Sequence, residues 1–94
     1  MHVSGTVAPG PDVYSQAVDA IRRIEESLRD AGAELRHVVR TRIFVTDIGL
    51  WEPIGKAHHE LFGEILPATS MIEVSKLIAP EFLVEIEAEA YIGD

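Results

Sequence analysis

The segment from Phe82 to Tyr91 alternates strictly between two sets of side chains. Successive side chains of a β-strand point to opposite faces of its sheet, so one face of this strand is apolar and the other aligns three carboxylates about 6.7 Å apart. The pattern therefore predicts a strand with one face in the core, and it directs the search for function to the other face. The apolar face holds Phe82, Val84, Ile86, Ala88 and Ala90, and the opposite face holds Leu83, Glu85, Glu87, Glu89 and Tyr91.

The remaining segments predict two helices and three further strands. Residues 13–32 and about 50–65 each have one apolar stripe at helical spacing. Asp12 is the expected N-cap of the first helix, and Gly32 is its expected C′ residue. Residues 2–8, 37–47, 68–75 and 82–92 predict strands. The order β-α-β-α-β-β is satisfied by two helices packed on one face of a mixed four-stranded sheet, an α+β fold, and residues 1–94 form a single domain.

The predicted sheet face that points away from the helices is both apolar and charged. Alternation along residues 37–47 assigns Val39 and Thr41 to the core face and Val38 and Arg40 to this second face. The hydrophobic fraction of the chain, 47%, is also high for a small monomer. We infer that another subunit covers the face, with arginine–glutamate pairs across strands or across the interface, because unpaired buried carboxylates are costly. Its expected members are Arg40, Arg42, Phe44, Thr69, Met71, Glu73, Glu85, Glu87 and Glu89.

The charge and composition exclude several classes of function. The net charge is −8, with 16 acidic and 8 basic residues and no basic cluster, so we expect no nucleic-acid partner and no membrane partner. The chain has no cysteine and no apolar targeting segment, so a cytoplasmic location is expected.

His58 and His59 are adjacent on a predicted helix and point about 100° apart. They cannot both face one ion, and we predict neither a metal site nor a cofactor.

Several segments occur in an order and spacing that identify a family. They are VSGTVA, YSQAVDAIRRIEESLRDAGAELRHVVRTRIFVTDI, HELFG, PATSMIEVSKL and LVEIEAEA, and together they span nearly the whole chain. The chain resembles the YjgF/RidA (reactive-intermediate deaminase) family, also labelled endoribonuclease L-PSP. The resemblance implies a chorismate-mutase-like fold and a homotrimer with a small-molecule cleft between subunits. It also implies hydrolysis of enamines and imines to a keto acid and ammonia.

The resemblance assigns roles to four residues of this sequence. Ser4 and Gly5 match the Ser-Gly pair that contributes to ligand binding, and Glu85 matches the glutamate of the last strand, implying a general acid/base. Thr69 occupies the ligand-binding position at which active members have an arginine that clamps the substrate carboxylate. Threonine cannot supply a bidentate cationic fork, which argues against efficient deamination of ordinary 2-imino acids. Gly55 replaces a frequent asparagine, and the usual N-terminal hairpin is absent from this sequence.

Three functions remain open from the sequence. The first is hydrolysis of an imine, an enamine or a related small metabolite, and the second is non-catalytic binding or sensing of a small metabolite on the same trimeric scaffold. The third, ribonuclease activity, is opposed by the acidic charge.

Structural roles are the alternatives to functional roles for single residues. Glu85 could pair with an arginine, Thr69 could be an ordinary strand residue, His58 is expected as a hydrogen-bonded core or cleft-edge residue, and Trp51 is expected in the core.

Overall fold

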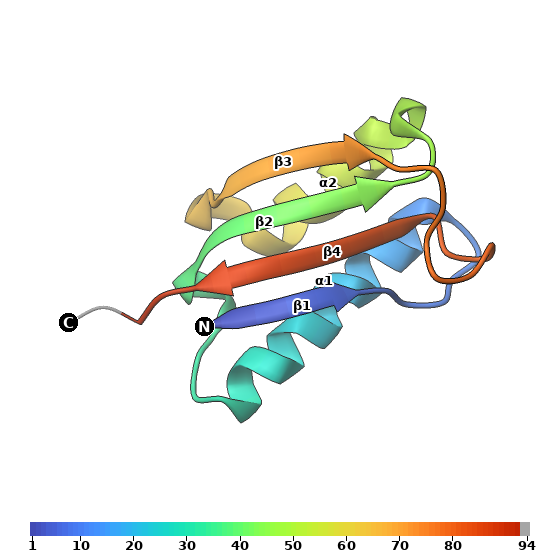
Figure 1. Cartoon of the computed structure of the whole chain (residues 1–94). Helices are drawn as coiled ribbons and strands as arrows, with labels where there is room; N and C mark the ends of the chain where they lie inside the picture. Colours follow the sequence, from blue (N-terminus) through green and yellow to red (C-terminus); the bar gives the residue numbers. More distant parts are fainter. Residues whose placement is uncertain (93–94) are drawn as a thin grey trace.

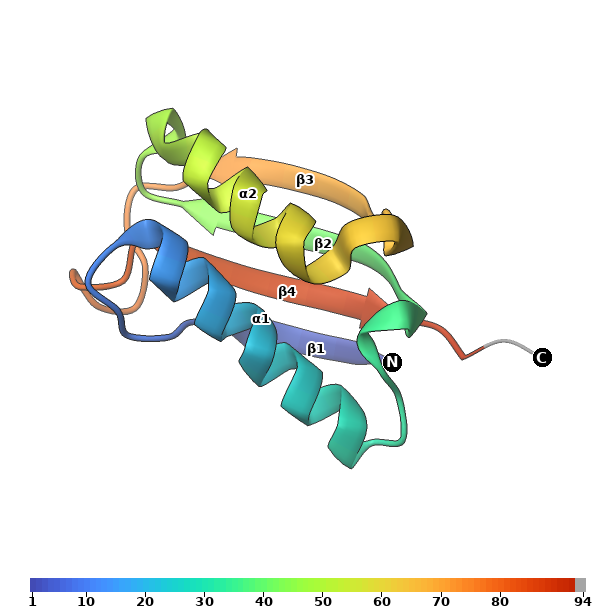
Figure 2. The ribbon, with the colours of Figure 1, turned by 180° about the vertical axis from the view of Figure 1, so that it is seen from behind.

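The computed structural model describes residues 1–92 and has two layers (Figure 1, Figure 2). One layer is a four-stranded sheet in the order β1-β4-β2-β3, and the other consists of two helices that cover one face of it. β2 and β3 are parallel, whereas β4 is antiparallel to both β1 and β2. The predicted order β-α-β-α-β-β is confirmed. The elements are β1 (His2–Thr6), α1 (Val13–Asp30), β2 (Val38–Val45), α2 (Trp51–Phe62), β3 (Ala68–Glu73) and β4 (Val84–Ala90), with short 3₁₀ turns at Leu35–His37, Ile48–Leu50 and Gly63–Ile65.

The ends of α1 follow from local sequence, as predicted. The carboxylate of Asp12 accepts a hydrogen bond from the backbone N–H of Ser15 at 2.8 Å, which satisfies one of the free donors of the first turn. Gly32 follows the C-cap with φ of +87°, a left-handed conformation that glycine adopts without steric cost. Within residues 1–92, neither helix is long and apolar enough to cross a membrane.

A buried glutamine joins α1 to the segment before β4. Gln16 is 2% exposed, and its Nε2 donates to the carbonyl oxygens of Gly10 and Glu81 at 3.2 and 2.9 Å. Its Oε1 accepts the backbone N–H of Leu83 at 2.8 Å. Gln16 therefore fixes the chain where it enters β4, and it satisfies backbone groups that burial would otherwise leave unpaired.

The strand β4 has the predicted alternation, but β2 departs from it at its first residues. Val38 is 3% exposed and Val39 is 51% exposed, the reverse of the prediction from simple alternation. The pairing of β2 with β4 shifts register between Val38 and Arg40. Such a bulge adds one residue to one strand and so inverts the facing of the residues before it. From Thr41 onward, alternate residues of β2 face the helices as predicted.

The open face of the sheet, which the helices leave uncovered, differs from the prediction along β3. Thr41 is fully buried under the helices, and the parallel register pairs Thr69 with Thr41 and Met71 with Ile43. Thr69, Met71 and Glu73 therefore lie on the helix side, and the prediction that they share a face with Glu85 is wrong. The open face consists of Arg40, Arg42, Phe44, Ala68, Ser70, Ile72, Glu85, Glu87 and Glu89.

The arginine–glutamate pairing expected on the open face is present within one chain. Arg42 donates to Glu87 across the β2–β4 pair at 2.8 Å and approaches Glu89 at 3.9 Å. Beside these charges, Ile72 is 41% exposed. Trp51, expected in the core, is 58% exposed at the start of α2, because the buried face of that helix is formed by Ile54, Ala57 and Phe62 instead.

Candidate functional site

Glu85 and Gly5 are in direct contact on the open face. Glu85 pairs with Phe44 of β2 and is partly buried. A Cβ atom added to Gly5 would lie 2.7 Å from Cδ of Glu85 and 2.9 and 3.0 Å from its two carboxylate oxygens. The carboxylate of Glu85 therefore occupies the space that any larger residue at position 5 would need, because carbon atoms in contact lie about 3.5–4.0 Å apart.

The contact depends on an irregularity of β1. The pairing of β1 with β4 shifts register between Val3 and Thr6, so that Ser4 and Gly5 form a bulge. Thr6 Oγ1 donates to the carbonyl oxygen of Ser4 at 2.9 Å within this bulge. Bulges occur often beside active sites, where they redirect the chain locally. Gly5 meets Glu85 at this bulge and Ser4 adjoins Gly5 in the chain, so three of the four predicted site residues belong to this part of the sheet.

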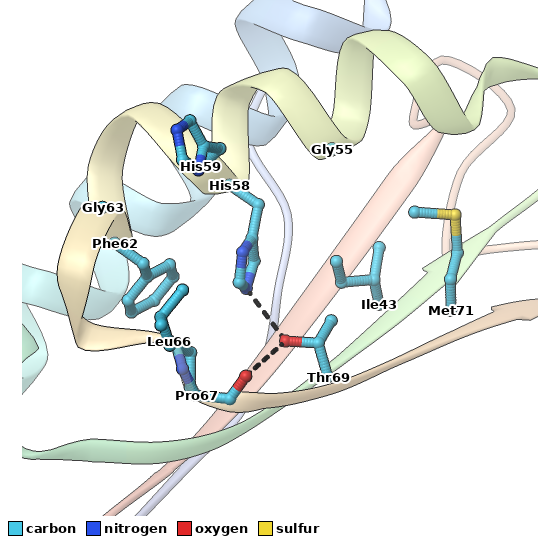
Figure 3. A pocket seen from close by; sticks show the side chains of 10 residues that line it. All are labelled: Ile43, Gly55, His58, His59, Phe62, Gly63, Leu66, Pro67, Thr69 and Met71. Atoms are coloured by element: carbon cyan, nitrogen blue, oxygen red, sulfur yellow. Dashed lines mark hydrogen bonds between the residues drawn. The ribbon is translucent and has the colours of Figure 1, made fainter.

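Thr69, the fourth, lines a separate cavity of about 250 Å³ between α2 and β3 (Figure 3). The cavity lies against the helix side of β3, an edge strand of the sheet. Gly55 of α2 also lines it, and a Cβ atom at Gly55 would meet nothing within 4 Å. Its apolar walls are Ile43, Phe62, Leu66, Pro67 and Met71, and its polar side chains are His58, His59 and Thr69.

A chain of hydrogen bonds fixes the polar groups of this cavity. Thr69 Oγ1 donates to the carbonyl oxygen of Pro67 at 3.1 Å, and it lies 3.0 Å from Thr41 Oγ1. Because the proton of Thr69 is used at Pro67, its oxygen accepts the proton of Thr41. The oxygen of Thr41, 2.9 Å from Nε2 of His58, then accepts the Nε2–H of that imidazole. His58 therefore donates to Thr41, Thr41 donates to Thr69, and Thr69 donates to the carbonyl oxygen of Pro67.

His58 is the interior member of this chain. Its ring packs on that of Phe62 with centroids 4.6 Å apart. Burial lowers the pKa of His58, and the neighbouring His59 adds to the effect. A neutral imidazole with its proton on Nε2 matches the donor order derived from the threonines. The expectation that His58 is a hydrogen-bonded residue at the edge of a cleft is confirmed, and His59 is exposed.

The two groups of site residues do not meet within one chain. Glu85 lies on the open face of β4, whereas Thr69 lies on the helix side of β3, and β2 separates the two strands.

Thr41 was predicted on the core face with no functional role, although it links His58 to Thr69 by hydrogen bonds. The sequence signal that could have indicated this role is a hydroxyl among the apolar residues of that face. Among residues 1–92, no three histidine or acidic side chains gather in a way that could hold a metal ion.

Comparison with known proteins identifies the family. The sequence model of the endoribonuclease L-PSP family matches residues 1–92. The chain belongs to this family, known also as YjgF/RidA. A RutC family protein of Pyrococcus abyssi is 34% identical over 88 residues, which cover 94% of this chain and 68% of the relative. A mouse 2-iminobutanoate/2-iminopropanoate deaminase is 31% identical over 90 residues, which cover 96% of this chain and 65% of the relative. The chain thus spans about two thirds of the length of these YjgF/RidA relatives.

Solved structures agree with this assignment. A Mycobacterium tuberculosis member of the YjgF/YER057c/UK114 family is 56% identical to this chain with a TM-score of 0.96, covering 97% of this chain and 77% of the other. The YjgF gene product of Escherichia coli is 26% identical with a TM-score of 0.87, covering 95% and 77% of the two chains. The fold is therefore the α+β, chorismate-mutase-like fold of the YjgF/RidA family.

Proposed function

We propose that this protein hydrolyses small imines or enamines in a cleft between the subunits of a homotrimer. The observation that carries the proposal is the division of the site into two halves. Glu85 with Ser4 and Gly5 forms one half on the open face, and the Thr69 cavity forms the other half beside the sheet edge. A neighbouring copy that covers the open face can bring its Thr69 cavity to Glu85, which a single chain cannot do.

The surface of one chain supports this association. Phe44 and Ile72 lie on the open face, and Ile72 is 41% exposed. β1 and β3, at the two edges of the sheet, present unpaired backbone groups within the described residues, and such edges readily pair with another chain. Covering these surfaces removes apolar area from water, and a domain of this size buries only a modest fraction of its chain surface alone.

The chemistry assigned to Glu85 is general base catalysis. Glu85 takes a proton from water as the water oxygen attacks the imine carbon, and it returns this proton to the imine nitrogen, which gives a carbinolamine. The remaining hydroxyl proton then passes to the amine nitrogen, again by way of Glu85, as the carbon–nitrogen bond breaks, and a carbonyl compound and ammonia leave. No electron transfer is needed, because the imine and one water become the carbonyl compound and ammonia. A positioned carboxylate that shuttles a proton in this way contributes about 10²–10⁴-fold to the rate. The relatives named as 2-imino acid deaminases support this reaction class.

The experiment measures ammonia release from freshly generated imines with purified protein. Glu85→Gln keeps the size of the side chain and removes the base, so we expect its rate to fall by at least about 10²-fold. Glu89→Gln is the matched control, since Glu89 lies on the same face of the same strand and outside the Gly5 contact. Light scattering gives the mass of the assembly. Equal rates for wild type and Glu85→Gln, or a monomer in dilute solution, would refute the proposal.

Non-catalytic binding of a small metabolite is the second candidate, and one observation favours it. The Thr69 cavity is lined by a hydroxyl and by an imidazole, that of His58, whose pKa burial lowers, and no carboxylate is among its lining residues in the described part of the chain. Thermal-shift measurements against a panel of metabolites separate the two functions. A ligand that raises the melting temperature without turnover in wild type supports binding, whereas turnover that depends on Glu85 supports catalysis.

A further inference from the structure

The Thr69 cavity contains no charged partner for an anion. None of its ten lining residues, all within the described part of the chain, is lysine or arginine. Its inner imidazole, His58, lies beside Phe62 and points toward Thr69 (Figure 3). His58 is half-buried, whereas His59 is exposed. A carboxylate that left water for this cavity would lose its hydration without gaining a cation, which is strongly unfavourable.

The donor order in the cavity adds a second constraint. The proton of Thr69 is committed to the carbonyl of Pro67, and the Nε2–H of His58 is committed to Thr41. A ligand that can only accept hydrogen bonds, such as a carboxylate, therefore finds no free donor on Thr69 Oγ1 or on Nε2 of His58. A hydroxyl oxygen has two lone pairs. The hydroxyl of Thr41 donates to one lone pair of Thr69 Oγ1. The second lone pair makes only a longer contact of 3.4 Å with Nε2 of His58, and it is therefore open to an N–H donor of the ligand.

We propose that this cavity selects an uncharged ligand that places an N–H group on Thr69 Oγ1 and a small apolar group against Ile43, Phe62 and Met71. The inference rests on the proposed function, because the cavity is one half of the cleft described above. For the hydrolase, the substrate class becomes neutral imines and enamines without a carboxylate. The carboxylate of Glu85 from a neighbouring subunit strengthens this selection, since it repels a second negative charge.

The binding test uses two probes of nearly identical shape, butyramide and butyrate. The amide is neutral and has N–H donors, whereas the carboxylate is an anion that only accepts hydrogen bonds. Affinities at neutral pH are measured by NMR titration of the full chain. We expect butyramide to bind wild type at least about tenfold more tightly than butyrate, the ratio that corresponds to about 1.4 kcal/mol. Equal affinities, or tighter binding of butyrate, would overturn the inference.

Two substitutions at position 69 test the assigned contact. Thr69→Val keeps the shape of the side chain and removes the oxygen, so we expect butyramide to bind more weakly and its preference over butyrate to shrink, while circular dichroism is unchanged. Thr69→Arg introduces a cation, and we expect it to reverse the preference in favour of butyrate. If Thr69→Val retains the wild-type preference for the amide, the assignment to Thr69 Oγ1 is wrong.

Turnover separates this inference from the proposed function. Ammonia release is compared for a neutral imine and for the corresponding 2-imino acid, in wild type and in Glu85→Gln. Faster turnover of the neutral imine supports both conclusions. Faster turnover of the imino acid keeps the hydrolase and overturns the selection for neutral ligands. Selective amide binding without any turnover overturns the hydrolase and keeps the selection, because the cavity then acts as a binding site alone.

Discussion

Replacing Gly5 by alanine tests whether the position of the Glu85 carboxylate decides activity. The new Cβ atom would lie 2.7 Å from Cδ of Glu85 and 3.0 Å or less from both oxygens. To reach an ordinary contact distance of about 3.5–4.0 Å, the carboxylate must retreat by roughly 1 Å. A misplacement of about 1 Å in a catalytic group costs on the order of 10²-fold in rate. We therefore expect Gly5→Ala to lower ammonia release by about that factor.

The same substitution should leave stability almost unchanged. The atoms that must move are the far end of a flexible side chain, and replacing glycine by alanine lowers the entropy of the unfolded chain by an amount worth about 0.4–1 kcal/mol where the backbone allows it. Urea unfolding should thus place Gly5→Ala within about 1 kcal/mol of wild type. A large loss of stability would show that activity falls through misfolding.

The double variant isolates the coupling between the two residues. If Gly5→Ala acts by displacing the carboxylate, adding it to Glu85→Gln should lower the rate no further, since the group it displaces has already lost its function. Additive losses, or a Gly5→Ala protein with the wild-type rate, would refute the argument that Gly5 exists to accommodate Glu85.

Three further predictions concern stability and the cavity. Gly55→Ala should stabilise the protein by about 0.5–1 kcal/mol, because alanine favours a helix interior more than glycine does and the new Cβ meets nothing within 4 Å. Lower stability in urea would contradict this prediction. The same substitution should weaken amide binding, because it narrows the cavity. Gln16→Leu should destabilise the protein by roughly 2–4 kcal/mol, because it leaves the N–H of Leu83 and the carbonyl of Glu81 without partners. Urea unfolding measures this loss, and a change in unfolding free energy below about 1 kcal/mol would contradict the prediction. Because the native pKa of His58 is lowered, the unfolded chain takes up a proton that the native chain does not, so stability should fall as pH decreases from about 6.5 toward the native pKa. His58→Gln should flatten that part of the profile of melting temperature against pH, and an unchanged slope would refute the assignment of this pH dependence to His58.

Much of the fold was predictable because its signals are local. The alternation from Val84 to Ala90, the N-cap at Asp12 and the glycine at position 32 each depend on a few neighbouring residues, and each is confirmed. A period of two fixes which side chains of a strand share a face, whatever the strand packs against.

The site was less predictable, because its geometry depends on register. Whether Val38 or Val39 is buried is decided by a bulge in the pairing with β4, and the face of Thr69 is decided by its parallel alignment with Thr41. A shift of one residue in either pairing would turn each side chain to the other face. No local pattern in residues 68–75 predicts which strand that segment will pair with, or in which register.

The sequence by itself determined the order of the elements, the family, the acidic surface and the apolar face of the last strand, because periodicity, caps and composition act within short segments. Only the tertiary structure decided that Glu85 rests on Gly5 while Thr69 is bonded to Thr41 on the opposite side of the sheet. The physical reason is that these contacts join residues 80 and 28 positions apart, and strand pairing alone sets the distance between them.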